Sequence, residues 1–329
     1  MLIESIELTM SHVGLGHLNE YAMLVLFGNA HSHHLTLNTG ILPNQIRDNQ
    51  GLVLYPAYFM THLTVPPNFN LADYKLWDKV SVGVDVTRFG ETMLESCYLL
   101  GRDGEVLPEI SQWSKEAYPY MKANSLIIVD VSEKNGEARK VSVPKAECFA
   151  SLPKLKKAPE AILRSRNIRN NGFGIKSGNI TMQEPLIYHV AKEQDAAAGH
   201  AMMFANFSKI MNWAEDVILS KRFRPGFSGN VLQFLSLLER ETFFYGNCFA
   251  GETLEIYLNG AITECAPNYH GDSLQTISVA LLTYQVEIYT QRNQNLLIIA
   301  SVKKLLALPI TLQDFIPDVQ RIIKNLKYI

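Results

Sequence analysis

The chain has 329 residues, of which 47% are hydrophobic and 19% are charged, and its formal net charge is −2. This composition is typical of a globular protein, and the length is sufficient for two domains of about 150 residues each. The absence of a basic excess argues against a nucleic-acid-binding protein. The cysteines form no CxxC pair, so we expect free thiols at Cys97, Cys148, Cys248 and Cys265.

The N-terminal segment does not resemble a signal peptide. It carries Glu4 and Glu7 where a signal peptide would be basic, and no long apolar stretch follows. The best candidate for a membrane span, 296–302, is shorter than the roughly 18 to 20 residues that such a helix needs, and it ends at Lys303. We therefore expect a soluble, cytoplasmic protein.

Residues 18–28 show the apolar density of a helix, for which Gly28 and Asn29 would form the C-terminal cap. Segment 53–63 predicts a strand, and Pro56 would place that strand at a sheet edge or a bulge.

A row of valines then predicts a strand with one buried face, because β-branched side chains recur at every second residue at Val80, Val82, Val84 and Val86. Two further strands are expected at 93–100 and 125–131, with a turn at 101–104 after the first of them.

Residues 151–174 differ from their surroundings. The stretch is basic between Lys154 and Arg169 and ends in the turn-forming sequence 170–174. We interpret it as a loop-rich linker between two units.

The second half repeats the order of helix and strands. A helix is predicted at 204–219, and segment 232–241 could be helix or strand. The expected strands are 242–245, 253–258, 262–265, 273–287 and 296–305. An amphipathic helix within 311–327 should begin near residue 316, because Pro317 suits a first helical turn.

The chain therefore contains one pattern twice: a buried helix followed by long strands. The first copy has helix 18–27 and strand 78–90, and the second has helix 203–215 and strand 251–260. One helix wrapped by a curled antiparallel sheet is the hot-dog unit. We predict an α+β, tandem hot-dog protein with units at 1–150 and 175–329 joined by the linker 151–174, although two unrelated α+β domains would share part of this pattern.

Four segments resemble one specific family. The stretches 10–24, 52–58, 88–94 and 203–215 are similar to the bifunctional acyltransferase/decarboxylases of the leinamycin-pathway (LnmK-like) type. The resemblance covers most of the chain and is weak over 105–170.

The resemblance implies a double hot-dog enzyme of polyketide biosynthesis. It would take a methylmalonyl-type group from coenzyme A, remove CO₂ and deliver the acyl group to an acyl carrier protein, without a resident cofactor. The family's acyl acceptor is a tyrosine of the first unit, which by motif position is Tyr55, with Tyr58 as the alternative. On a regular strand these two residues point to opposite faces, and a bulge at Pro56 would change that.

Decarboxylation of such a thioester produces an enolate and requires no strong base. Backbone N–H groups at a helix N-terminus suit the developing negative charge. Gly16 and His17 precede the first helix, and Gly199 and His200 precede the second, so we predict that these residues bind substrate or take part in catalysis. The alternative is that they only turn the chain.

A tyrosine with a pKa near 10 is a poor nucleophile unless a base or charge activates it. The candidates near Tyr55 in sequence are His12, His17 and His62. The competing interpretation is that Tyr55 and Tyr58 are aromatic core residues.

Asn206 lies in the second helix motif, where its amide could hydrogen-bond the thioester carbonyl or the substrate carboxylate; the alternative is a capping or internal contact. Glu20 and Glu215 lie in the two helices and could act as acids or bases, or be exposed or paired. Residues 31–34 contain three histidines, but no carboxylate or cysteine stands at ligand spacing. We expect a solvated turn there and no metal site.

The basic stretch 154–169 is a candidate surface for coenzyme A phosphates or an acidic carrier protein, unless it is simply a solvated linker. No P-loop, GxSxG or HExxH motif is present. The sequence thus favours an acyltransferase/decarboxylase acting on acyl-CoA and an acyl carrier protein. The alternatives are a hot-dog thioesterase or β-hydroxyacyl dehydratase, and a non-catalytic acyl-carrier-binding scaffold. A homodimer is compatible with each.

Overall fold

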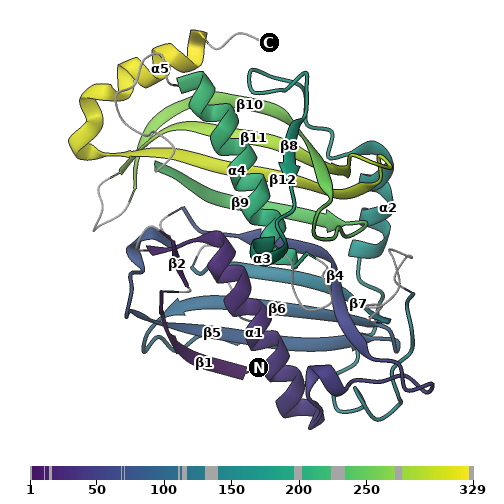
Figure 1. Ribbon diagram of the computed structural model, residues 1–329. Helices are drawn as coiled ribbons and strands as arrows, with labels where there is room; N and C mark the ends of the chain where they lie inside the picture. The colour runs from purple at the N-terminus through teal and green to yellow at the C-terminus, as the bar shows by residue number, and fades with distance from the viewer. Residues whose placement is uncertain are drawn as a thin grey trace.

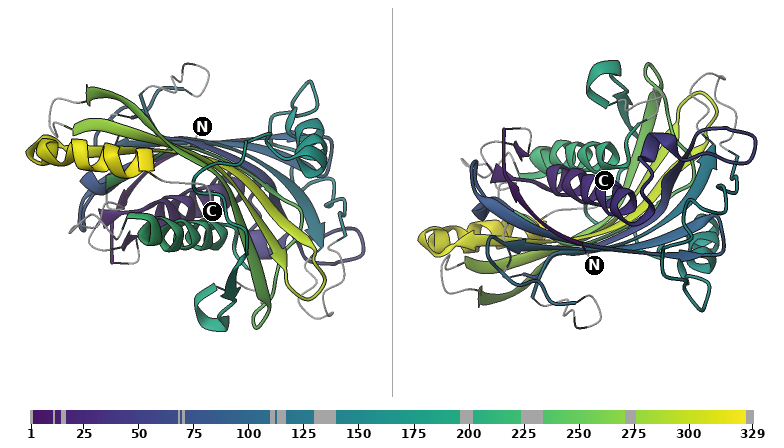
Figure 2. Two further views of the ribbon diagram at one scale, coloured as in Figure 1. Left: turned by 90° about the horizontal axis from the view of Figure 1, so that it is seen from above. Right: turned by 90° about the horizontal axis from the view of Figure 1, so that it is seen from below.

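A computed structural model describes residues 2–10, 12–14, 17–67, 69, 71–109, 112, 117–129, 140–195, 202–223, 234–270 and 276–325. Ten strands form a single curved antiparallel sheet in the order β1-β5-β6-β7-β4-β9-β12-β11-β10-β8. Two long helices lie side by side on one face of this sheet (Figures 1 and 2).

The N-terminal unit supplies the first half of the sheet and one of these helices. Its strands and helix are β1 (Leu2–Glu7), α1 (Glu20–Thr39), β4 (Leu54–Thr64), β5 (Lys79–Phe89), β6 (Met93–Arg102) and β7 (Tyr120–Val129). A two-stranded ribbon, β2 (Val13–Gly14) and β3 (His17–Leu18), precedes α1, and short 3-10 turns follow at Pro43–Gln45 and Leu71–Asp73. The predicted valine row is buried on β5, with all four side chains fully inaccessible.

The C-terminal unit has the same order of elements. These are β8 (Leu186–His189), α4 (Phe204–Phe223), β9 (Leu235–Phe244), β10 (Thr253–His270), β11 (Thr276–Thr290) and β12 (Leu296–Pro309). A short helix, α3 (Lys192–Asp195), precedes α4, and a 3-10 turn (Ile310–Phe315) leads into α5 (Ile316–Asn325). The predicted start of the last helix at residue 316 is confirmed.

The two units meet through their second strands. Each unit is a five-stranded sheet, β1-β5-β6-β7-β4 in one and β8-β10-β11-β12-β9 in the other, and β4 pairs with β9 antiparallel. Two copies of one strand order joined at equivalent edges are related by an approximate twofold axis. The tandem α+β hot-dog architecture predicted from the sequence is therefore confirmed.

The register of the sheet locates this axis. One row of paired residues crosses seven of the strand boundaries, and all its side chains lie on the helix-covered face: Val84, Tyr98, Met121, Leu63, Arg240, Val302, Tyr284 and Gly260. From either end, the row passes through equivalent strands of the two units in the same order. At its centre, Leu63 of β4 faces Arg240 of β9. The axis thus passes between Leu63 and Arg240, and it relates Tyr98 of β6 to Tyr284 of β11.

The two helices cross antiparallel above this centre. Glu20 at the start of α1 contacts Asn212 of α4, and Phe204 at the start of α4 lies against Gly28 of α1. A Cβ atom built on Gly28 would lie 3.4 Å from the Phe204 ring. Gly28 therefore permits the close approach of the two helices.

The structure corrects the predicted end of the first helix. α1 begins at the cap residue Asn19, whose side chain accepts a hydrogen bond from Ala22, and it continues past Gly28 to Gly40, which adopts a left-handed conformation with φ 69°. Glycine within a helix costs about 1 kcal/mol, but it does not end the helix when packing holds the next turns. The histidines at 31–34 are consequently helical rather than a solvated turn.

Two strand predictions and the linker are also revised. β4 is interior to the sheet, and its register shift lies between Tyr58 and Met60 rather than at Pro56. Because β4 pairs with β9 only from Met60 onward, Pro56 has a neighbouring strand on one side only. The expected strands 253–258 and 262–265 form one continuous strand, β10.

The stretch predicted as a loop-rich linker contains a helix, α2 (Ala161–Asn171). Ala161 and Ile168 of α2 pack with Met60, Phe243 and Ile299 in a small second core. Residue 242 faces the helices, so neighbouring Phe243 faces the opposite side of the sheet. On that opposite side, α2 covers the junction of β4 and β9, which we call the seam. Among the described residues, no helix is long and apolar enough to cross a membrane.

Candidate functional site at the seam of the two units

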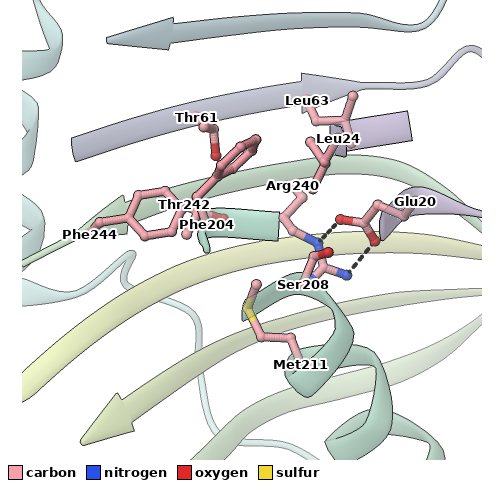
Figure 3. A pocket seen from close by; sticks show the side chains of 10 residues that line it. All are labelled: Glu20, Leu24, Thr61, Leu63, Phe204, Ser208, Met211, Arg240, Thr242 and Phe244. Carbon is pink, nitrogen blue, oxygen red and sulfur yellow. Dashed lines mark hydrogen bonds and ion pairs between the residues drawn. The ribbon is translucent and has the colours of Figure 1, made fainter. Parts of the chain in front are cut away.

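A small cavity lies on the approximate twofold axis, between the two helices and the two seam strands. Its volume is about 10 Å³, which is room for roughly one water molecule. The lining residues come from both units, as Figure 3 shows: Glu20, Leu24, Thr61, Leu63, Phe204, Ser208, Met211, Arg240, Thr242 and Phe244.

The axis gives this cavity two flanks with equivalent positions and different chemistry. Glu20 and Phe204 are each the first residue of their helix, and Gly28 and Asn212 are each the ninth. His31 and Glu215 are each the twelfth. We call one flank the ion-paired half-site (Glu20, Asn212, Glu215, Arg240, Tyr284 and Lys304) and the other the neutral half-site (Gly28, His31, Tyr58, Tyr98 and Phe204).

The ion-paired half-site begins with a buried salt bridge between the units. Arg240 Nε lies 2.8 Å from Glu20 Oε1, and both side chains are more than nine-tenths buried (Figure 3). Arg240 Nη2 donates to Glu20 Oε2 at 3.0 Å and to Asn212 Oδ1 at 2.8 Å.

The same network continues into the C-terminal unit. Lys304 Nζ donates to Asn212 Oδ1 at 3.1 Å and to Glu215, and Tyr284 donates to Glu215 as well. Burial raises the pKa of Tyr284 well above its ordinary value, and the Glu215 charge adds to this effect. Two acids and two bases are thus paired with one another. Removing one partner would leave a buried charge unpaired, so we interpret this half-site as structural.

The neutral half-site contains a chain of three hydrogen-bonding side chains. The hydroxyl oxygens of Tyr58 and Tyr98 are 2.7 Å apart, and the Tyr98 hydroxyl lies 2.9 Å from His31 Nδ1. The Tyr58 ring packs edge-on against Phe204, with ring centroids 4.7 Å apart. Since Phe204 lines the cavity, Tyr58 stands directly behind the cavity wall.

Burial determines the charge state of this chain. Burial, with a smaller contribution from neighbouring His34, lowers the pKa of His31 to about 3. Burial also raises the pKa of Tyr58, against the opposing effect of the hydrogen bond with Tyr98, and it raises that of Tyr98. All three side chains are therefore uncharged at neutral pH.

The two predicted tyrosines of β4 lie on opposite faces, as their spacing predicted. Leu54 and Tyr58 belong to the core beneath the helices, so the intervening alternation places Tyr55 on the other face of the sheet. Tyr58 is the one that reaches the seam. The role of either residue stays a prediction.

The structure places the remaining predicted site residues as follows. Gly16, Gly199 and His200 lie outside the described residues, and of His17 the backbone is described as part of β3 but the side chain is not. Asn206 is buried, and its Nδ2 donates to the Asp195 carbonyl at 2.6 Å. Asn206 is two residues beyond Phe204, so it projects from the opposite side of α4 and does not meet Tyr58.

Sequence reasoning missed Arg240, Lys304, Tyr98 and Tyr284, because each pairs with a residue far away in the chain. His31 had a signal that could have found it. It follows Phe27 by four residues, and its burial on the same helix face follows once the helix is continued past Gly28.

The basic stretch is partly used within the fold. Arg164 forms a two-pronged ion pair with Glu241 at 2.5 and 2.6 Å, and Arg169 lies over the Tyr245 ring. Lys156, Lys157 and Arg166 are exposed. No group of three or more possible metal ligands occurs in the part of the chain that the structure describes.

Neither a protein-family model nor a curated protein matches this sequence. Solved structures do match over nearly the whole chain. The chain is similar to a putative oleoyl thioesterase from Lactobacillus plantarum, with 12% identity over 93% of this chain and 96% of that one and a TM-score of 0.61.

Two further structures are similar in the same way. An acyl-ACP thioesterase from Bacteroides thetaiotaomicron has 11% identity and a TM-score of 0.54, and the 12:0-ACP thioesterase from Umbellularia californica has 11% identity and a TM-score of 0.51. Each match covers 92% of this chain and 96% of the other. At these identities the likeness concerns the fold, and this chain has the double hot-dog fold.

Proposed function

We propose that this chain is an enzyme that acts on short acyl thioesters of coenzyme A or an acyl carrier protein, and that the reaction takes place at the neutral half-site. Its structural neighbours are described as thioesterases, two of them acting on acyl carrier protein thioesters, which supports this substrate class. The observation that carries the proposal is the uncharged chain of Tyr58, Tyr98 and His31 beside the seam cavity.

The neutrality of this half-site favours decarboxylation followed by acyl transfer. Hydrolysis needs a group that removes a proton from water. The charged side chains of the seam, such as Glu20 and Glu215, are held in the ion-paired half-site, and Asp195 near the start of α4 accepts from Lys209 Nζ at 3.1 Å. Decarboxylation of a malonyl-type thioester needs an oxyanion donor and a site sheltered from water, which neutral side chains can supply.

Phe204, Met211 and Phe244 fill the seam and leave about 10 Å³, room for roughly one water molecule. An acyl group therefore enters the seam only when these side chains move, and the length of the acyl group is proposed from the sequence resemblance alone. A methylmalonyl-type group, which becomes propionyl on loss of CO₂, is the substrate that the sequence resemblance implies. Delivery to a carrier protein in polyketide biosynthesis is part of the same proposal.

Hydrolysis is the second candidate. The neighbours' names favour it, and the cavity can hold about one water molecule beside Glu20. In that case Glu20 would have to leave Arg240 in order to act as the base.

The test is to incubate the purified chain with methylmalonyl-CoA or, separately, propionyl-CoA, with and without an acyl carrier protein, and to identify products by mass spectrometry. The proposal expects CO₂ release and a propionyl thioester, carrier-bound when the carrier is present. Free acid and free coenzyme A without CO₂ would establish hydrolysis instead. Turnover of neither methylmalonyl-CoA nor propionyl-CoA would contradict both candidates.

A further inference from the structure

The direction of the hydrogen bonds in the neutral half-site follows from the surroundings of His31. Its Nε2 is buried and has no hydrogen-bond partner among the described residues. A buried N–H without a partner is rarer and costlier than a buried acceptor without one. The proton of neutral His31 is therefore better placed on Nδ1, which lies 2.9 Å from the Tyr98 hydroxyl and 3.2 Å from Ser96 Oγ.

The directions of the other hydrogen bonds then follow from the number of hydrogens that each group can donate. His31 Nδ1–H donates to the Tyr98 oxygen, and Tyr98, with one O–H, donates to the Tyr58 oxygen 2.7 Å away. The Tyr58 hydroxyl hydrogen is left for another acceptor. Hydrogen bonds in such a chain polarise one another, so the last donor is strengthened.

We propose that Tyr58 is a hydrogen-bond donor to the thioester oxygen of the substrate rather than its covalent acceptor, and that His31 and Tyr98 are positioning residues that orient and polarise it. This rests on the proposed function. The raised pKa of Tyr58 agrees with the assignment, because a phenol that stays protonated is a donor and a poor nucleophile.

In this role Tyr58 keeps its proton throughout. As the bond between the carboxyl carbon and Cα breaks, its electron pair forms the enolate, whose oxygen accepts from Tyr58, and CO₂ leaves. Cα then takes a proton from water, the thioester is restored, and the hydroxide that remains combines with the released CO₂ as bicarbonate. No bond to Tyr58 forms, and nothing is oxidised or reduced.

The tyrosine equivalent to Tyr98 shows why only one half-site has this chain of hydrogen bonds. Tyr284 occupies the position of Tyr98, but it donates to Glu215, the residue that occupies the position of His31. A carboxylate can only accept, so the hydroxyl hydrogen of Tyr284 is directed into the core, toward Glu215, and not outward.

The experiment measures decarboxylation of methylmalonyl-CoA by full-length variants. Tyr58→Phe should lower kcat by about 10²–10³ with little change in KM, as removal of an oxyanion donor does. Tyr98→Phe and His31→Ala should each lower kcat by about tenfold, since they weaken the donor without removing it. His34→Ala is the control, because it removes an equally buried imidazole of α1, and the Tyr98 hydroxyl has its described hydrogen bonds with Tyr58 and His31 rather than with His34.

A second measurement distinguishes a donor from a nucleophile. Fluorinated tyrosine at position 58 is a more acidic donor, so kcat should rise or hold, and intact-protein mass spectrometry should show no acyl adduct. An acyl group on Tyr58, or wild-type kcat in Tyr58→Phe while the wild type turns over, overturns this inference alone. Absence of turnover in the wild type overturns the proposed function and this inference with it.

Discussion

Gly28 of α1 and Asn212 of α4 occupy equivalent positions in the two units and make opposite kinds of contact. Gly28 leaves space for the Phe204 ring, whereas Asn212 joins Glu20 and Arg240. At each of three equivalent positions, one unit has an apolar residue and the other a polar one: Phe204 for Glu20, Leu63 for Arg240 and Gly28 for Asn212. The two flanks of the duplicated fold therefore differ in chemistry: one is the ion-paired half-site and the other is the neutral half-site.

The closeness of Gly28 to Phe204 predicts that the free energy of unfolding depends steeply on the size of the side chain at position 28. Gly28→Ala adds a Cβ at an ordinary contact distance of 3.4 Å and removes a helix-interior glycine, so we expect the free energy of unfolding to rise by up to about 1 kcal/mol. Gly28→Leu should instead displace Phe204 and lower stability by about 1–3 kcal/mol. Urea denaturation of both variants checks this, and equal effects of Ala and Leu would contradict it.

The buried pair of Glu20 and Arg240 predicts strong non-additivity. Arg240→Leu alone leaves Glu20 buried without its partner and should cost about 3–5 kcal/mol of stability. The double variant Glu20→Leu/Arg240→Leu removes both buried charges and should recover much of that loss. A double-mutant cycle by urea denaturation measures the coupling free energy between the two residues. Additive effects of the single variants would show that the pair is not coupled.

Acid should destabilise the protein through His31. Its pKa is about 3 in the folded chain and near 6.5 when unfolded, so between these values the unfolded state binds more protons. The free energy of unfolding should therefore fall as pH drops from 6.5 toward 3, by up to about 1.4 kcal/mol per pH unit from this residue. Burial likewise lowers the pKa of His34, which adds to the trend.

The check is urea denaturation between pH 7 and pH 4.5 for the wild type and His31→Gln. The variant should show a shallower slope than the wild type, because it lacks the imidazole that is buried in the neutral form. Equal slopes for the wild type and His31→Gln would mean that His31 is not buried in the neutral form.

The exposed cations beside α2 predict an effect on carrier docking. Reversing Lys156, Lys157 and Arg166 to Glu should lower kcat/KM for an acyl carrier protein substrate by about tenfold at low salt, because carrier proteins are acidic and steering is electrostatic. The same variant should use a short acyl-pantetheine, which lacks that acidic surface, at the wild-type rate. Loss of both activities would indicate misfolding rather than impaired docking.

Periodicity indicated most helices and strands of the duplicated architecture, and the family resemblance favoured the tandem hot-dog arrangement over two unrelated α+β domains. The alternating valines of β5, the helix starting at Phe204 and the helix starting at Ile316 are local patterns, and each is present in the structure. The end of α1 was not predictable in this way, because contact with α4 across the seam compensates for the glycine at position 28.

The candidate site depended almost entirely on tertiary structure. By resemblance the sequence indicated Tyr55 first and Tyr58 as the alternative, and it indicated Glu20 and Glu215 by their place in helices. The partners of Tyr58, Glu20 and Glu215 are 40 to more than 200 residues away, at Tyr98, Arg240 and Lys304. A charge pattern along the chain does not specify which acid meets which base. Local spacing indicated most of the helices and strands. The packing of each helix on the strands of its own unit brought Tyr58, Tyr98 and His31 together. The antiparallel register of β4 with β9 brought Arg240 to Glu20, because burial and pairing are properties of the assembled structure.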